Sequence, residues 1–123
     1  MHKKILVVDD NLEIRTLYRM LLESHHLDVL EASDGIEALE ILADTEVNLI
    51  ITDCTMPRMS GPEMITTIKS LYPSLPFIVV SSTVRKMDFE ELNPVAMLSK
   101  PFYLKDLVNA VDETVGTEKM PDN

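Results

Sequence analysis

Short apolar runs alternate along this chain with segments of helical periodicity, and little sequence separates one from the next. The strongest runs cover residues 5–8, 47–51 and 77–80, and weaker ones cover 27–30 and 95–98. Runs of this length that are rich in Val and Ile and apolar at nearly every position are typical of strands buried on both faces. The pattern therefore predicts five strands of a parallel sheet.

The segments between and after these runs carry apolar residues at helical spacing, which predicts amphipathic helices that each turn one face to a core. Four stripes are visible: Ile14, Leu17, Tyr18 and Leu21; Ile36, Leu39, Leu42 and Ala43; Met64, Ile68 and Leu71; and Leu104, Leu107, Val108, Val111 and Val115.

Helix end signals agree with these stripes. Asp34 precedes Glu37 by three residues, and Ser60 precedes Glu63 by three, which is the spacing of a capping box. Gly116 follows the last stripe and supplies a C-terminal stop. Right-handed crossovers between parallel strands place helices on both faces of one sheet. The predicted fold is α/β, a three-layer, doubly wound, five-stranded parallel sheet.

Length and composition fit a single domain with a proper core, since the chain has 123 residues, of which 46% are apolar. We expect this domain to cover residues 1–116. Residues 117–123 are polar, and we interpret them as a frayed end or the start of a linker.

Net charge and the search for targeting signals limit the cellular locations and the partners that are expected for this protein. The formal net charge of -10 repels phosphate backbones, so direct nucleic-acid binding is not expected. The apolar runs are far too short to span a membrane, the start of the chain lacks the apolar stretch of a signal peptide, and Cys54 is the only cysteine. We therefore expect a cytoplasmic protein that does not bind membranes.

Polar residues follow four of the five predicted strands. Asp9 and Asp10 follow the first strand, Asp53 the third, Ser81 the fourth and Lys100 the fifth. Each has an ordinary structural interpretation when taken alone, such as helix capping for Asp9 and Asp10 or turn formation for Asp53. Ligands of doubly wound sheets bind at the carboxyl ends of the strands, so the coincidence favours a functional site there.

Three clustered carboxylates repel one another, and therefore either raise a pKa or recruit a cation. Mg²⁺ suits oxygen ligands and commonly completes its coordination with water and phosphate oxygens. A metal ion and an ammonium group beside a carboxylate form a site where that carboxylate attacks a phosphoryl group. The predicted product is an aspartyl phosphate.

The chain resembles the receiver domains of response regulators in two-component signalling, including the chemotaxis regulator, from Lys3 to Val115. The matching segments are 5–11, 31–39, 53–61, 79–82 and 100–102. The resemblance implies a flavodoxin-like strand order of 2-1-3-4-5. It also implies that Asp53 accepts phosphate, that Asp10 binds Mg²⁺ directly and Asp9 largely through water, and that the backbone carbonyl of Thr55 is a further metal ligand.

The resemblance further implies that Lys100 pairs with the phosphoryl group through a cis peptide bond to Pro101, and that Ser81 is the switch hydroxyl. Two features depart from the family. Met97 stands where an aromatic residue usually couples the site to the surface, and the segment from Ser81 to Lys100 is a few residues short. Because Pro94 also interrupts helical geometry, we expect a fourth helix that is short, irregular or absent.

The resulting hypothesis is a phosphorylation-dependent switch, a phosphoacceptor that assists its own phosphorylation and dephosphorylation but is not an enzyme. A sensor histidine kinase, a phosphotransfer protein or a small phosphodonor would phosphorylate it with Mg²⁺. The region of helices 4 and 5 would then bind an unknown output partner or an output domain that this sequence lacks. One alternative is a degenerate receiver that docks without phosphate. A phosphohydrolase with an aspartyl nucleophile is disfavoured, because enzymes of that family carry two aspartates two residues apart after one strand, whereas Asp9 and Asp10 are adjacent here and Asp53 is remote. A flavodoxin-like cofactor carrier is disfavoured because Asp9 and Asp10 would repel the phosphate of the cofactor.

Overall fold

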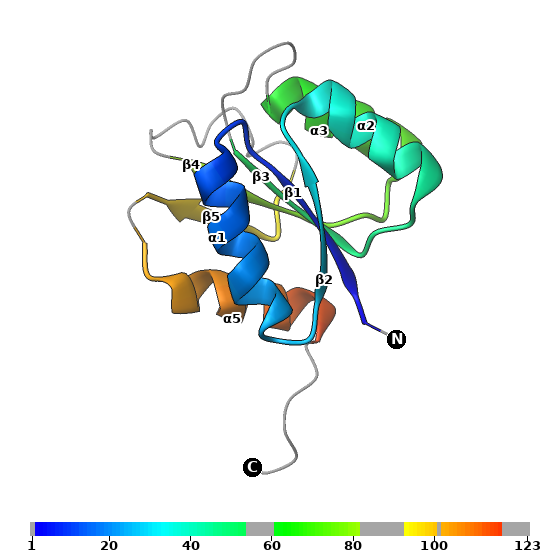
Figure 1. The fold of residues 1–123 in the computed structure, drawn as a ribbon. Helices are drawn as coiled ribbons and strands as arrows, with labels where there is room; N and C mark the ends of the chain where they lie inside the picture. The colour runs from blue at the N-terminus through cyan, green and yellow to red at the C-terminus, as the bar shows by residue number, and fades with distance from the viewer. Residues whose placement is uncertain (1, 54–60, 82–92, 101, 117–123) are drawn as a thin grey trace.

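Five parallel strands form one sheet in the order β2-β1-β3-β4-β5 (Figure 1). The structure is a computed structural model that describes residues 2–53, 61–81, 93–100 and 102–116. The strands are β1 (Lys4–Val8), β2 (Asp28–Ala32), β3 (Leu49–Asp53), β4 (Phe77–Ser81) and β5 (Ala96–Ser99). The predicted fold class and the strand order implied by the family resemblance are both confirmed.

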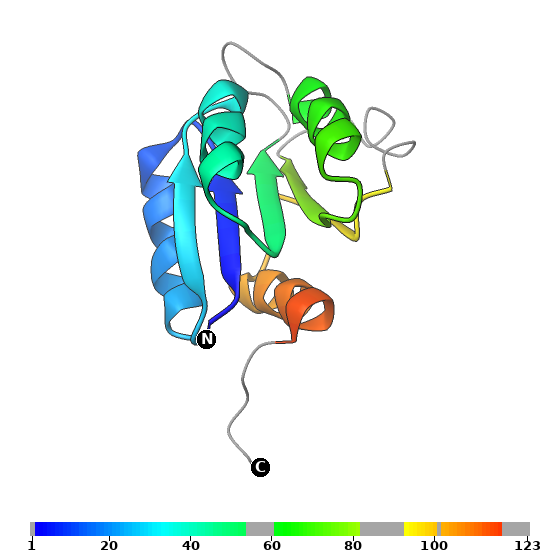
Figure 2. The same cartoon turned by 90° about the vertical axis from the view of Figure 1, so that its right-hand side faces the viewer.

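Two of the helices that the structure describes cover each face of the sheet (Figures 1 and 2). The described helices are α1 (Leu12–Glu23), α2 (Gly35–Asp44), α3 (Gly61–Leu71) and α5 (Leu104–Val115). Helices α2 and α3 lie side by side on one face, and α1 and α5 lie on the other (Figures 1 and 2). Within the described ranges, every helix is too short to cross a membrane. The predicted irregularity of a fourth helix concerns residues 83–93, nearly all of which lie outside the described residues.

Alternate residues of each strand enter two separate cores, as the period of two in a strand requires. In β1, Leu6 and Val8 face the core beneath α2 and α3, while Ile5 and Val7 face the core beneath α1 and α5. All four side chains are almost fully buried. This burial on both faces explains why the strand sequences are apolar at consecutive positions.

Some of the predicted boundaries and core assignments are wrong by one or two residues. The apolar runs at 27–30 and 47–51 begin before β2 and β3 do, because Leu27 and Val47 are buried in the core ahead of the paired strand. Leu17 and Leu71 were expected in the helix cores but are 42% and 60% exposed. Both lie at the edge of their stripes, where the helix surface turns away from the sheet.

Two helix ends follow the predicted chemistry. The Asp34 carboxylate accepts the backbone N–H of Glu37 at 2.8 Å and so caps α2, while the Glu37 carboxylate accepts the backbone N–H of Ser33. Helix α5 ends at Gly116, whose φ of 68° lies in the left-handed region that glycine adopts without strain. Ser60, the other predicted cap, lies outside the described residues.

Candidate functional site at the carboxyl edge of the sheet

Three predicted carboxylates meet where the central strands end. Asp9 and Asp10 follow β1, and Asp53 is the last residue of the adjacent strand β3. One carboxylate oxygen from each residue lies within 4.8 Å of the others. The parallel arrangement accounts for this meeting, because it brings the carboxyl ends of β1 and β3 to the same edge although 43 residues separate Asp10 from Asp53 in the sequence.

Lys100 also approaches this cluster, from the last strand in the order of the sheet. Its Nζ atom lies 3.8 Å from Asp9 Oδ2 and 4.0 Å from Asp53 Oδ1. Lys100 directly follows β5, which is separated from β1 by two strands. The lysine side chain is 26% exposed, whereas the side chains of Asp9 and Asp53 are 4% and 17% exposed. The cation therefore lies over carboxylates that are largely shielded from water.

Burial is the main influence on the ionisation of Asp9. It raises the pKa of the Asp9 carboxyl above the ordinary value of 3.8, and the negative charges of Asp53 and Asp10 add to this rise. A hydrogen bond from the Asn11 backbone N–H at 2.9 Å and the charge of Lys100 oppose it without cancelling it. Asp9 is thus held in an environment that disfavours its own charge, which a bound cation would relieve.

The cap of α1 is Asn11, which corrects the ordinary interpretation of Asp9 and Asp10 as capping residues. Asn11 Oδ1 accepts the backbone N–H of Ile14 at 3.2 Å. Asp9 stands two residues earlier, and its carboxylate accepts the Asn11 N–H instead. The chain turns between β1 and α1, and Asn11 is the residue directly before the helix. Asn11 therefore caps α1, and Asp9 remains in the carboxylate cluster.

Two residues near Asp9 were missed by the sequence interpretation. Arg15 on α1 donates from Nη1 to the backbone carbonyl oxygen of Asp9 at 2.7 Å. Tyr18, one turn further along α1, is 3% exposed, and burial together with the charges of Asp9 and Asp53 raises its pKa to about 12. Arg15 and Arg19 stand one helical turn apart in the sequence. This spacing could have predicted that the two side chains share an anionic partner.

The remaining predicted site residues are only partly described. Ser81 ends β4 and pairs in register with Ser99 of β5, which places its backbone at the same sheet edge. Its side chain, Thr55 and the peptide bond to Pro101 lie outside what the structure describes. Met97, at the position of the usual coupling aromatic, pairs in register with Val79 and packs half-buried against the core beneath α2 and α3.

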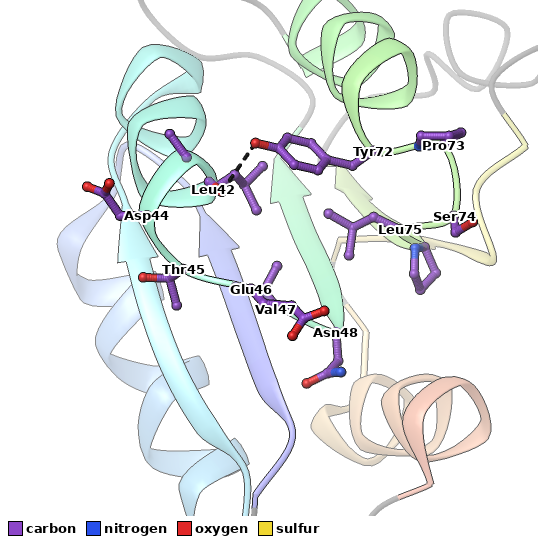
Figure 3. A pocket seen from close by; sticks show the side chains of 12 residues that line it. Leu42, Asp44, Thr45, Glu46, Val47, Asn48, Tyr72, Pro73, Ser74 and Leu75 are labelled. Atoms are coloured by element: carbon purple, nitrogen blue, oxygen red, sulfur yellow. Dashed lines mark hydrogen bonds between the residues drawn. The ribbon is translucent and has the colours of Figure 1, made fainter.

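A cavity of about 660 Å³ lies at the opposite edge of the sheet. Residues that precede β3 and β4 line it, including Leu42, Val47 and Leu75, and the Tyr72 hydroxyl donates to the Leu42 carbonyl oxygen at 3.2 Å across its rim (Figure 3). It therefore contains none of the predicted site residues. This cavity and the carboxylate cluster are therefore separate features of the molecule.

Comparison with known proteins places this geometry in a family. The model of the response regulator receiver domain matches residues 5–112. Protein PilG of Pseudomonas aeruginosa is 36% identical over 113 residues, which cover 88% of this chain and 84% of PilG. The sensor kinase CckA of Brucella abortus is 34% identical over 114 residues, which cover 89% of this chain but 12% of CckA.

A solved structure agrees with this match. The response regulator TrrA of Thermotoga maritima, in complex with Mg²⁺ and beryllofluoride, superimposes with a TM-score of 0.85 at 27% identity and covers 92% of this chain and 99% of its own. The match of the family model spans the sheet, the carboxylate cluster and Lys100 together. The chain belongs to the response-regulator receiver domains of two-component signalling.

Proposed function

We propose that this receiver domain is a phosphorylation-dependent switch in which Asp53 accepts the phosphoryl group. The observation that supports this assignment best is the convergence of three carboxylates and Lys100 at one edge of the sheet. Asp53 is the more exposed of the two aspartates that Lys100 approaches, so it is the carboxylate that a phosphodonor can reach. Its oxygen attacks phosphorus, the bond from phosphorus to the donor breaks (P–N for a phosphohistidine, P–O for a small acyl phosphate), and an acyl phosphate forms on Asp53.

The donor atoms fit Mg²⁺, because carboxylate oxygens are the ligands that this hard cation prefers. Asp9, Asp10 and Asp53 would hold it, together with the backbone carbonyl of Thr55 that the family resemblance implies. When bound, Mg²⁺ neutralises the carboxylates and the oxygens of the incoming phosphoryl group. Asp9 and Asp10 would serve only the metal, whereas Asp53 would both contribute to the metal site and react.

Lys100 and Ser81 have the remaining roles. The ammonium group of Lys100 neutralises the charge that develops on the phosphoryl oxygens, for which its position 4.0 Å from Asp53 Oδ1 is suited. Ser81, at the end of the neighbouring strand, is assigned the switch hydroxyl that hydrogen-bonds the phosphoryl group. These groups assist the gain and loss of phosphate at Asp53, so the domain promotes its own modification without turning over a separate substrate.

The partners follow from this role. The phosphodonor is a sensor histidine kinase, a phosphotransfer protein or a small acyl phosphate. The output is a change in the region to which the family resemblance assigns helices 4 and 5. Relatives differ in length, since the chain covers most of PilG but a small part of CckA. The output is therefore assigned either to a separate partner or to a further domain. Direct contact with nucleic acid is not proposed, because the net charge is -10.

Intact-mass measurement after incubation with acetyl phosphate tests the proposal. With Mg²⁺, the wild-type chain should gain the mass of one phosphoryl group, and Asp53→Asn should gain none. Asp44→Asn is the matched control, because Asp44 is an exposed aspartate near the cavity at the other edge of the sheet. Equal labelling of Asp53→Asn, or labelling that a chelator leaves unchanged, would contradict the assignment.

A degenerate receiver that docks without phosphate is the second candidate, and Met97 is the feature that favours it. A half-buried methionine can repack when its surroundings change, but it lacks the polar end of the aromatic residue that it replaces. This candidate predicts a chain that binds its output partner equally well before and after treatment with acetyl phosphate. The switch predicts a change in that affinity.

A further inference from the structure

We propose that Arg15 is a positioning residue for the metal site, because it fixes the peptide of Asp9 and thereby aims the Asp9 carboxylate. This inference rests on the proposed binding of Mg²⁺ by Asp9. It concerns a residue on α1 whose side chain makes no described contact with the carboxylate itself. The contact is with the main chain: Nη1 of Arg15 donates to the Asp9 carbonyl oxygen at 2.7 Å.

The carbonyl of Asp9 needs such a donor because β1 has already ended. The last paired residue of β1 is Val8, and the Asp9 N–H still donates to Ala32 at the end of β2 at 3.1 Å. Beyond this bond the chain turns toward α1 and leaves the sheet. A carbonyl oxygen in a residue that is only 3% exposed requires a partner, and a guanidinium group supplies a charge-assisted one.

Arg15 is itself held in place by Glu31 on β2. Its Nε atom donates to Glu31 Oε1 at 2.9 Å, and Nε of Arg19 donates to the second oxygen, Oε2, at 2.6 Å. The Glu31 carboxylate is thus fixed from both sides by two arginines one turn apart on α1. The Arg15 side chain is 14% exposed, so its guanidinium lies in one well-defined position between β2 and the site.

Together these contacts leave Asp9 little freedom. Its N–H is bound to β2, its carbonyl to Arg15, its Oδ1 to the N–H of Asn11, and its Oδ2 lies near Lys100. Of the four, the Arg15 contact is the only one made by a side chain of α1, in the first turn of that helix. Loss of that contact frees the Asp9 peptide to rotate, which displaces a proposed ligand without removing it.

The direction of the change in Mg²⁺ affinity on removal of Arg15 distinguishes a positioning role from a purely electrostatic one. Arg15 is a cation close to a proposed cation site, so its charge alone disfavours Mg²⁺, and its removal should tighten metal binding. If Arg15 aims Asp9, its removal should weaken metal binding instead. Arg19 provides a matched control, because it shares Glu31 and carries the same charge but makes no described contact with Asp9.

The experiment measures Mg²⁺ affinity by isothermal titration calorimetry for the wild-type chain, Arg15→Met and Arg19→Met. Methionine keeps much of the apolar stem and removes every donor. We expect Arg15→Met to bind Mg²⁺ about 10-fold more weakly, as for other residues that orient a metal ligand. Arg19→Met should bind it as well as the wild type or more tightly. Should either variant not fold, Arg15→Lys and Arg19→Lys are compared, with the same order of affinity expected.

A metal-free readout accompanies the titration. The Asn11 N–H is protected by Asp9 Oδ1, so its amide hydrogen exchange should be faster in Arg15→Met than in Arg19→Met. Unchanged or tighter Mg²⁺ binding by Arg15→Met, or equal weakening in both variants, would overturn the inference. Absence of Mg²⁺ binding by the wild-type chain would instead overturn the proposed function, so the two failures are distinguishable.

Discussion

The two edges of the sheet carry polar groups of similar kinds but use them in opposite ways. At the amino edge, Asp28 pairs with His2 at 3.1 Å on the surface, and Asn48 accepts the N–H of Lys4 at 2.8 Å. These groups are satisfied locally and stay hydrated. At the carboxyl edge, Asp9 is buried beside Asp10 and Asp53. There the like charges are held together by the fold, against their mutual repulsion.

This difference separates groups that stabilise the sheet from groups that we assign to the proposed binding site. At the amino edge, the Asn48 side chain supplies the acceptor for the first backbone N–H of β1. Burial, together with the charges of Asp53 and Asp10, raises the pKa of Asp9, so the charged form of Asp9 lowers the stability of the domain. A structural element that is unfavourable by itself is the feature expected of a ligand site.

The largest effect is expected for Lys100→Ala. Removing a group that neutralises charge in the transition state should slow phosphorylation by acetyl phosphate about 100-fold or more, with a much smaller change in the unfolding midpoint. Lys105→Ala is the control, because Lys105 is exposed and stands 5.7 Å from the ring of Tyr103. Time-resolved intact-mass measurement reports both rates. Equal rates for the two variants would remove Lys100 from the site.

The second-largest effect is expected when Mg²⁺ is added to the folded chain. Mg²⁺ at 100 times its dissociation constant should increase the free energy of unfolding by about 2.7 kcal/mol, because it binds only the folded chain. Urea unfolding with Mg²⁺ or with a chelator measures this. The increase should be much smaller in Asp9→Asn and unchanged in Asp44→Asn. Equal stabilisation of all three chains would mean that the metal binds elsewhere.

A smaller effect is expected for Asp9→Asn without metal. This substitution removes a buried charge but keeps an oxygen for the Asn11 N–H, so it should increase the free energy of unfolding at neutral pH by about 1 kcal/mol, the usual size of a single-site effect. The folded-state pKa of Asp9 is raised from 3.8. The destabilisation is therefore absent below the unfolded-state pKa and complete above the folded-state pKa.

The increase in the free energy of unfolding caused by Asp9→Asn should therefore grow as the pH rises from the unfolded-state pKa of Asp9 to its folded-state pKa. Above the folded-state pKa, the increase should stay constant. Chemical unfolding at a series of pH values, with a chelator present, measures it. A gain that shrinks with rising pH would show that Asp9 is stabilised as a carboxylate in the folded chain.

The smallest effect is expected at the amino edge. Asn48→Ala removes the acceptor for the Lys4 N–H, and should lower the free energy of unfolding by about 0.5 kcal/mol, the low end for a hydrogen bond, because this contact is exposed. Phosphorylation by acetyl phosphate should be unaffected. A change in phosphorylation rate comparable with that of Lys100→Ala would break the distinction between the two edges.

Much of this arrangement could be predicted from local sequence. The apolar runs and stripes predict the alternation of strands and helices, and the spacing of Asp34 and Glu37 predicts the cap of α2. The approach of Asp9 to Asp53 follows from parallel topology alone. Burial at stripe edges was less predictable, as Leu17 and Leu71 show, because the width of the buried face depends on how each helix lies on the sheet.

The contacts of Arg15 could not be predicted in the same way. Glu31 lies 16 residues away on a neighbouring strand, and the bond to the Asp9 carbonyl involves main-chain geometry that leaves no residue pattern. Both depend on where α1 lies relative to β2. The roles of all the predicted site residues remain predictions, and those of Asp10, Thr55 and Ser81 rest on the family resemblance. The structure places Asp10 and the end of β4 at the same edge of the sheet as Asp53.

Binding of beryllofluoride, observed by fluorine NMR, tests most directly whether the carboxyl edge is a cation-dependent phosphoryl site. This anion mimics a phosphoryl group on a carboxylate and requires the same surroundings. The account predicts bound fluorine resonances in the wild-type chain with Mg²⁺, and none in Asp53→Asn or when a chelator replaces the metal. Bound resonances that persist in Asp53→Asn, or that are equally strong in the presence of the chelator, would contradict it.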